Sequence, residues 1–524
     1  MTGPGTTAAV TPALTPVLAC AGCGFRVPDG APLALRCPLA RPGDNIDHVL
    51  TRVLGSGAGP FPAGDEANPF VRYRSLFHAY HVARSIGWSD ADYVALVERL
   101  DRSVARVDGH GFRVTPFARS DELSARLGFS DRGGAWVKDE TGTVSGSHKA
   151  RHLFGTLLEL EVEAARAARG GSARVGSADA ADAGTAPAPG SSAPLAIASC
   201  GNAALAAAVV ARAAGRPLDV FIPTDADSVV VARLRDLGAR LVLCERQPGV
   251  PGDPTYHRLL DALAAGAVPF TCQGNLNGLA IEGGETLGWE IAATIGRADR
   301  AEMPGGRGRS RGPDRLDRLF VQVGGGALAS SCVRGLAEAR DLGAPFELPR
   351  LHTVQTRGAY PLARAHERVL ARVAAGESIE AALAFAAHHR SAFMWPWEDA
   401  PRSIAHGILD DETYDWLAVV RGMLETGGVA LVVDEETLVE ANELAVSATG
   451  IDADETGTSG LAGLLALVRA GEIGPDESVA VLFTGARRRV DPAAARPADG
   501  PPSRPADQPA AHDTTPHPTN GGKR

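Results

Sequence analysis

Short, uninterrupted apolar runs alternate with helical patterns along most of this chain, and no other feature constrains its fold as strongly. Runs of Val, Leu, Ile and Phe are typical of strands buried on both faces, as in parallel sheets. Parallel strands need long crossover connections, which are usually helices. The pattern therefore predicts an α/β fold with parallel sheets. Strands are expected at 135–138, 195–199, 219–222, 240–244, 319–323, 351–355, 429–433 and 479–483.

Three segments rich in Gly, Pro, Ser and Ala have no face to bury and are interpreted as linkers or tails. They lie at 170–194, about 300–315 and 491–524. The predicted organisation is an N-terminal extension with a cysteine cluster and a helical region, followed by a main body with two parallel sheets and a cleft between them. The boundaries are 1–110 for the extension and 111–490 for the body, with a smaller subdomain at about 195–295 and a larger one from 111–170 plus 315–490.

Helical patterns fill the stretches between the expected strands, with apolar residues at helical spacing. The expected helices lie at 148–166, 202–214, 228–237, 283–295, 327–340, 435–449 and 459–469. The run NPFVRYRSLFHAYHVARSIGW adds a helical region to the N-terminal extension.

Composition narrows the class of protein. The 524 residues are 44% hydrophobic and 22% charged, which is ordinary for a globular chain with a sizeable core. A net charge of −10 argues against a nucleic-acid backbone as the main partner. No apolar run of about 18 residues is present, so no membrane span is expected. Seven unevenly spaced cysteines and an N-terminus without a basic region favour the cytoplasm.

Three glycines follow the expected strand at 319–323, and a helix is expected to begin at Ala327. Gly324, Gly325 and Gly326 let backbone N–H groups approach a ligand at the positive end of the helix dipole. Such a turn suits a phosphate group. The G-x-G-x-x-G pattern of dinucleotide sites is absent, which weakens a dehydrogenase reading and favours a single phosphate. A glycine-rich turn without a ligand is the alternative.

Lys149 is expected in the first turn of a helix, directly behind a strand end. The helix dipole and burial both disfavour protonation there, and a neutral amine is what a Schiff base needs. A solvated lysine is the simpler alternative when this segment is taken alone.

Two further strand ends carry polar groups. Ser199, Cys200, Gly201 and Asn202 lie between a strand and a helix, where successive N–H groups suit a carboxylate, although plain helix capping explains them as well. Thr484 ends the last expected strand at the carboxyl edge of the sheet, where α/β proteins bind ligands, or it caps a turn.

Taken together and in this order, the motifs resemble those of the fold-type-II pyridoxal-phosphate enzymes. They read S-H-K at 147–149, S-C-G-N at 199–202, G-G-G-A at 324–327 and F-T-G at 483–485, with supporting matches at 282–291 and 455–462. The nearest branch resembles threonine synthase, threonine dehydratase and related ammonia-lyases, within the tryptophan synthase β-like superfamily. The resemblance covers roughly residues 110–490.

The resemblance implies a role for each motif. Lys149 would form the Schiff base with pyridoxal phosphate and move the proton at the substrate Cα. Asn202 would bind the 3′-oxygen of the cofactor, and Thr484 would face its pyridine nitrogen. The phosphate would lie at Gly324, Gly325, Gly326 and Ala327, and the substrate carboxylate at Ser199, Cys200 and Gly201.

The resemblance implies a lyase or synthase acting on a small amino acid, as a homodimer. A neutral hydroxyl at Thr484 makes the cofactor ring a weaker electron sink than an aspartate would, which fits β-elimination or β-replacement. Two alternatives stay open: γ-replacement on a phosphohomoserine-type substrate, and a catalytically silent homologue with a regulatory role. His148 departs from the Phe usual in synthases and dehydratases, so the substrate is not specified. Trp395 and Trp397 either line a substrate pocket or pack between subdomains.

Cys20, Cys23 and Cys37 supply three of the four ligands that tetrahedral zinc needs, and C-x-x-C is a common half-site. No fourth cysteine follows, and His48 and Asp47 stand at no recognised spacing. A degenerate module without metal is therefore favoured over a zinc site.

Overall fold

The computed structural model describes residues 16–55, 59–170, 193–247, 249–250, 252–295 and 312–488. Nearly all of the predicted linker at 170–194, most of the segment at 300–315 and the whole tail at 491–524 lie outside the described residues. The predicted α/β fold is confirmed, because two sheets of mainly parallel strands make up the main body. Each of the predicted strands occurs within one residue of its expected ends.

The larger sheet has the strand order β11-β10-β9-β12-β4-β3. Its strands are β3 (Phe117–Arg119), β4 (Gly134–Asp139), β9 (Arg318–Gln322), β10 (Arg350–Thr356), β11 (Ala430–Val433) and β12 (Ser478–Phe483). They run parallel, except that the short edge strand β3 pairs antiparallel with β4. Short strands of this kind lack a run long enough to be recognised, and β3 was not predicted.

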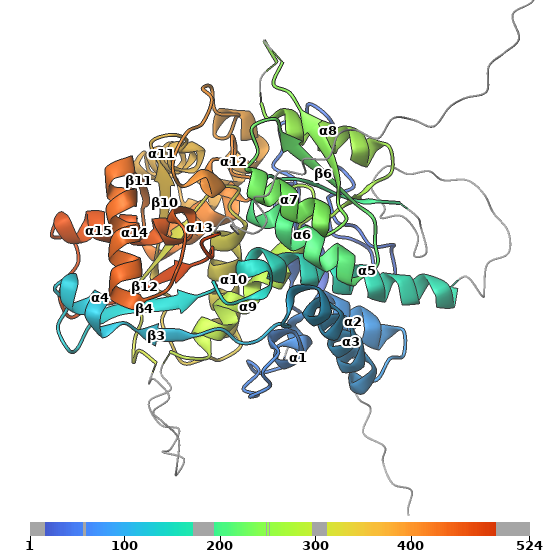
Figure 1. The fold of residues 1–524 in the computed structure, drawn as a ribbon, viewed down its shortest axis with the longest axis horizontal. Coiled ribbons are helices and arrows are strands. Elements are labelled where there is room, and N and C mark those ends of the chain that lie inside the picture. Colours follow the sequence, from blue (N-terminus) through green and yellow to red (C-terminus); the bar gives the residue numbers. More distant parts are fainter. Residues whose placement is uncertain are drawn as a thin grey trace, which may run out of the picture. The chain divides into compact units, whose positions relative to one another are not determined.

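Helices cover both faces of this sheet, which explains why β4, β9, β10 and β12 are buried along most of their length. Along β9, Leu319 and Val321 join the hydrophobic core around α10, whereas Phe320 joins the core around α14 and α15. Figure 1 shows α14 and α15 beside the sheet. The helices of this region are α4 (Asp121–Arg126), α10 (Ala327–Asp341), α11 (Pro361–Ala374), α12 (Ile379–His388), α13 (Trp416–Thr426), α14 (Glu435–Thr449) and α15 (Glu455–Arg469).

The smaller sheet has the order β7-β6-β5-β8, and all its pairs are parallel. Its strands are β5 (Leu195–Ala198), β6 (Leu218–Pro223), β7 (Arg240–Cys244) and β8 (Val268–Pro269), with helices α6 (Asn202–Ala213), α7 (Ser228–Asp236) and α8 (Pro254–Ala264). Helix α6 consists mostly of Ala and Val and is buried along most of its length, because it lies against α5 and α3 as well as the sheet.

Three helices pack in a row, with α9 (Leu279–Ala292) between α5 (Lys149–Gly170) and α10. Glycines allow this close approach. A Cβ added at Gly155 would lie 2.7 Å from Gly283 Cα, and one added at Gly288 would lie 2.7 Å from the Cys332 carbonyl oxygen. Helix α9 begins four residues before its predicted start because Leu279, Ala280 and Ile281 are buried and continue its apolar pattern. Helix α9, which carries the motif at 282–291, thus packs between α5, which begins at Lys149, and α10, which begins at Ala327.

The N-terminal extension holds an antiparallel pair, β1 (Val17–Cys20) with β2 (Leu50–Val53), and then helices α1 (Pro69–Arg72), α2 (His78–Ser85) and α3 (Asp90–Asp108). Phe77 packs edge-to-face on Trp289, which attaches this region to α9. Among the described residues, no helix is both long and apolar enough to cross a membrane. The predicted domain boundaries stay a prediction.

Candidate functional site

Lys149 is the first residue of α5 and is half-buried. The turn before it is held against the end of β12: Ser147 forms a β-bridge with Gly485, and the Ala486 N–H donates to the Gly146 carbonyl at 2.9 Å. Ser145 adopts a φ of 59° in this turn, a left-handed conformation that costs a side-chain-bearing residue about 1–3 kcal/mol. The amine therefore starts from a fixed backbone at the carboxyl edge of the larger sheet.

The three glycines follow β9 at the same edge of the sheet. Gly326 has a φ of 95° and forms the N-cap of α10. The segment 408–415 lies directly on this turn: the Thr413 hydroxyl donates to the Gly324 carbonyl at 2.9 Å, and the Asp415 N–H donates to the Gly325 carbonyl at 3.1 Å. An added Cβ at Gly325 would lie 3.0 Å from Tyr414 Cδ2, so glycine keeps the turn open to its neighbours.

Asp410 interacts with residues of three predicted motifs, which are Lys149, Gly325 and Cys200. Its carboxylate accepts a hydrogen bond from the Gly325 N–H and lies within electrostatic range of Lys149. Its negative charge also acts on Cys200. Burial raises the pKa of Asp410 to about 6, against the opposing effect of Lys149 and the Gly325 N–H. Asp410 therefore contacts the glycine turn and lies within electrostatic range of both Lys149 and Cys200.

The segment 199–202 follows β5 and leads into α6, with Gly201 as the helix N-cap. The Gly201 N–H donates to Ser199 Oγ at 3.4 Å. Burial is the main cause that raises the pKa of Cys200 to about 11, so this thiol is neutral at neutral pH. Asn202 Nδ2 lies beside Gly485, 3.1 Å from where a Cβ would stand. The segment therefore approaches the end of β12 as well as Asp410.

Thr484 is buried at the end of β12, and its hydroxyl has a defined partner. Gln322, the last residue of β9, donates from Nε2 to Thr484 Oγ1 at 2.7 Å. The same Nε2 lies 2.8 Å from the Gly457 carbonyl and 3.2 Å from the Leu482 carbonyl. Two carbonyl neighbours can only accept, so they fix which end of the amide faces Thr484. The Thr484 hydroxyl therefore accepts from Gln322 and keeps its own proton for another acceptor.

Two histidines flank Lys149 without adding charge. His148 and His152 are buried, with ring centroids 5.6 Å apart, and His152 Nδ1 lies 2.8 Å from the Ala280 carbonyl. Burial, reinforced by the nearby charge of Lys149, lowers the pKa of His148 well below its usual value and that of His152 to about 3. Both rings are therefore neutral at neutral pH.

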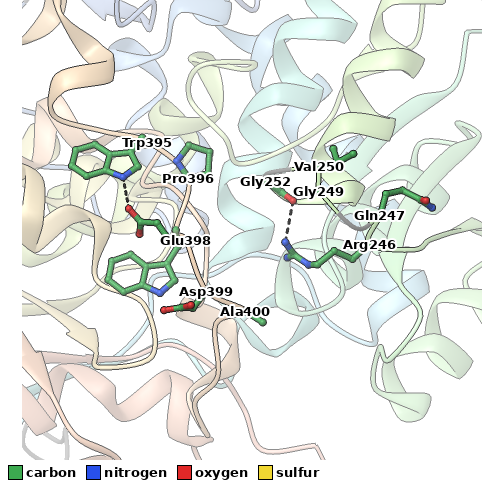
Figure 2. Close-up of a pocket in the computed structure, with 11 residues that line it drawn as sticks. Arg246, Gln247, Gly249, Val250, Gly252, Trp395, Pro396, Glu398, Asp399 and Ala400 are labelled. Atoms are coloured by element: carbon green, nitrogen blue, oxygen red, sulfur yellow. Dashed lines mark hydrogen bonds between the residues drawn. The ribbon is translucent and has the colours of Figure 1, made fainter.

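A cavity of about 710 Å³ opens between the 246–252 loop and the 395–400 loop, and Trp395 and Trp397 line it. Figure 2 shows the two loops facing each other across this space. Both tryptophans are also packed: Arg364 Cζ lies 3.6 Å from the Trp395 ring centroid and 5.1 Å from that of Trp397. None of the predicted cofactor residues lines this cavity. The loop with Trp397 is tied to the segment after Asp410, because the Trp397 N–H donates to the Asp411 carbonyl at 2.9 Å.

The family model described as "Pyridoxal-phosphate dependent enzyme" matches residues 110–485, which is most of the chain. The chain belongs to this family. Pyridoxal phosphate is thus the cofactor of this pyridoxal-phosphate-dependent enzyme. Its curated relatives include a threonine synthase of Methanosarcina acetivorans, 23% identical over 56% of this chain and 61% of the relative. A threonine synthase of Methanocaldococcus jannaschii is 25% identical over 43% of this chain and 47% of the relative.

These matches span less than two thirds of either curated relative. Among solved structures, maize serine racemase is 18% identical, with a TM-score of 0.49 over 76% of this chain and 94% of that one. The processed threonine deaminase isoform 2 of Solanum lycopersicum is 15% identical, with a TM-score of 0.49 over 77% and 91% of the two chains.

The residues of this pyridoxal-phosphate-dependent enzyme fit its cofactor. The glycine turn already directs an N–H group at an anion, the Asp410 carboxylate, so it offers what a phosphate needs. Lys149 lies within electrostatic reach of that same carboxylate, so an amine and an anion-binding turn are neighbours. Thr484 adds a neutral hydroxyl at the same edge of the sheet.

Sequence reasoning missed Asp410 and Gln322, which carry no motif of their own. It also left one signal unused. Only three of the 52 basic Lys and Arg residues are lysines, at positions 138, 149 and 523. Nearly all other cationic residues are arginines, whose guanidinium stays protonated and cannot supply a neutral amine. A lysine kept at 149 therefore points to amine chemistry.

Proposed function

We propose that this chain is a pyridoxal-phosphate-dependent lyase or synthase that performs β-elimination or β-replacement on a small amino acid. One observation carries the proposal: Asp410 packs on the glycine turn and accepts from the Gly325 N–H, and Lys149 and Cys200 both lie within electrostatic range of its carboxylate. An amine, an anion-binding turn and a carboxylate-binding loop are the groups that such a reaction requires in one place.

When bound, the cofactor supplies an electron sink for the bonds at the substrate Cα. The Lys149 amine holds the cofactor and then moves the proton at Cα. Asn202 hydrogen-bonds the 3′-oxygen of the cofactor. The phosphate is held by Gly324, Gly325, Gly326 and Ala327, and the substrate carboxylate by Ser199, Cys200 and Gly201.

The Thr484 hydroxyl favours the β-position reactions. Because it accepts from Gln322, its proton is available for donation to an unprotonated pyridine nitrogen. A neutral donor leaves that nitrogen uncharged, which limits how much negative charge the ring accepts. Reactions in which a leaving group departs readily from Cβ need the least electron withdrawal by the cofactor ring.

A second candidate is γ-replacement on a phosphohomoserine-type substrate, which yields threonine. The names of both curated relatives favour it, and a neutral hydroxyl at Thr484 is compatible with it. A silent homologue is the third candidate, and the retained Lys149 speaks against it. A homodimer in the cytoplasm completes the proposal.

A substrate panel separates these candidates. The purified holoenzyme is offered serine, threonine, cysteine, diaminopropionate and O-phosphohomoserine, and keto acid, ammonia, phosphate and new amino acids are measured. Keto acid and ammonia, or a replacement product at Cβ, support the first candidate. Threonine with free phosphate from phosphohomoserine supports the second. Cofactor spectral changes without product from any substrate contradict both.

Lys149→Ala tests the role of the amine. We expect it to abolish turnover and the covalent cofactor adduct, whereas Lys523→Ala, a control substitution at a lysine that no cofactor motif contains, keeps both. Borohydride reduction followed by peptide mapping should place the adduct on the peptide with Lys149. An adduct on Lys138 instead, or full turnover in Lys149→Ala, refutes the proposal.

A further inference from the structure

The N-terminal extension brings four potential metal ligands together: Cys20, Cys23, Cys37 and His48, called here the cysteine–histidine cluster. Their ligand atoms all lie within 4.8 Å of one another. Cys20, Cys37 and His48 are buried, and Cys23 is half-buried. This is a side-chain cluster that the proposed reaction does not use.

The distances within the cluster match those of a tetrahedral site. Zinc binds sulfur at about 2.3 Å and imidazole nitrogen at about 2.0–2.1 Å, so a tetrahedron has edges of about 3.8 Å between sulfurs and about 3.5 Å between sulfur and nitrogen. Here Cys23 Sγ lies 3.7 Å from Cys37 Sγ, and Cys20 Sγ lies 3.5 Å from His48 Nδ1. Two of the six edges thus already have tetrahedral length, and the remaining pairs of ligand atoms lie within 4.8 Å of one another.

Backbone N–H groups support the sulfurs. Those of Gly22 and Cys23 donate to Cys20 Sγ, and that of Leu39 donates to Cys37 Sγ. Gly24, with a φ of 73°, closes the turn after Cys23 by donating to the Cys20 carbonyl at 3.0 Å. The turn thus has the form of a prepared ligand loop.

The His48 ring is also oriented in a way that suits metal binding. Its Nε2 lies 3.0 Å from Asp44 Oδ2, so the Nε2–H donates a hydrogen bond to that carboxylate. The ring therefore presents the lone pair of Nδ1 to the sulfurs. A carboxylate behind a histidine is the arrangement that fixes the tautomer of metal-binding imidazoles. Asp47, the other acidic candidate, is committed elsewhere: its Oδ1 accepts from Trp416 Nε1 at 3.0 Å.

We propose that Cys20, Cys23, Cys37 and His48 bind one structural Zn²⁺ ion in tetrahedral geometry. Four protein ligands leave no open position, so the ion serves the fold rather than catalysis. Soft thiolates with one imidazole select zinc over magnesium or calcium.

The ion ties the extension to the main body. Next to His48, the Asp47 N–H donates to the Ala387 carbonyl at 2.8 Å, and its carboxylate binds Trp416 at the start of α13. Beyond it, Arg52 in β2 forms buried ion pairs with Glu282 and Glu285 of α9. Loss of the ion frees the loop that carries these contacts, and the thermal midpoint of unfolding should fall.

The test is metal content of the full-length protein, measured by mass spectrometry after dialysis in chelator-free buffer. We expect about one zinc per chain in the wild type and about none in Cys37→Ser and His48→Ala. Asp44→Asn should weaken zinc affinity by about 10- to 100-fold. Cys244→Ser, which changes a buried cysteine in β7, is the matched control and should keep its zinc. A wild type without zinc, or a zinc content unchanged in Cys37→Ser, overturns the proposal.

Cobalt substitution keeps the proposal testable if Cys37→Ser does not fold. Wild-type protein exchanged into Co²⁺ should show the visible absorption of a tetrahedral site together with sulfur-to-cobalt charge transfer. The spectrum of octahedral cobalt, or a disulfide between two cluster cysteines in the freshly purified protein, refutes the site. Both readouts are independent of pyridoxal phosphate, so failure here leaves the proposed reaction untouched.

Discussion

The contact between α5 and α9 places Lys149, and Gly155→Ala tests how tightly. An added Cβ at Gly155 would lie 2.7 Å from Gly283 Cα and 3.0 Å from Gly283 N. Ordinary contact begins at 3.4 Å, so the helices must separate by 3.4 − 2.7 = 0.7 Å. Both opposing atoms belong to backbone, so no side chain can rotate away to relieve the contact.

Two effects of opposite sign decide the outcome. Replacing glycine by alanine inside a helix stabilises by about 0.5–1 kcal/mol. Overpacking a close helix contact costs about 1–3 kcal/mol. The second effect is larger: mid-range values of about 2 and about 0.75 kcal/mol leave a net loss of about 1 kcal/mol in the free energy of unfolding. Lys149 lies six residues before Gly155 on the same helix, and a shift of this size should also lower turnover, since a 1 Å misplacement costs up to about 100-fold.

Urea unfolding of the apoprotein measures the stability, and steady-state turnover on the substrate found by the panel measures the shift of Lys149. Gly142→Ala is the matched control, because a Cβ at Gly142 meets nothing within 4 Å. It should change stability by less than about 0.5 kcal/mol. A Gly155→Ala protein as stable as the wild type would refute the packing argument, since helix propensity alone would then decide.

Two further predictions concern the edge of the sheet. Burial raises the pKa of Asp410 to about 6, so the folded chain holds its proton longer than the unfolded chain, and the resulting stability is lost as pH rises from about 4 to about 6. Asp410→Asn should reduce this decline and raise the free energy of unfolding at pH 7 by up to about 3 kcal/mol in urea titrations, and an unchanged pH profile would contradict the burial argument. Thr484→Val removes one acceptor of Gln322 Nε2 and should cost about 1 kcal/mol in the same assay. It should also cut turnover at least about 10-fold, whereas Thr484→Ser should restore it; equal turnover in both variants would exclude a role for the hydroxyl.

Several parts of the fold follow from sequence because their signal is local. The strands β5, β6, β9 and β12 are continuous apolar runs, and a run buried on both faces is visible without knowing its neighbours. The strands β1, β2, β3 and β8 have two to four residues and were not predicted. The strands β5 and β11, also of four residues, were recognised because their apolar runs stand between helical patterns.

The residues of the candidate site likewise fall into two groups, those recognisable from the sequence and those that only the structure reveals. Lys149, Thr484 and the glycine turn at 324–326 are recognisable because each follows a strand end in the printed order of the chain. The acidic group among them, Asp410, lies in a segment with no periodicity, and only its packing on Gly324 and Gly325 reveals it.

The sequence alone thus determined the parallel α/β architecture and the positions of the cofactor motifs, because apolar runs and glycine turns act over a few neighbouring residues. Only the tertiary structure decided that Asp410 joins these motifs and that His48 completes the cysteine–histidine cluster. His48 follows Cys20 by 28 positions and meets it only because β1 pairs with β2. Contacts of this kind depend on how distant segments pair in space, which no spacing along the chain records.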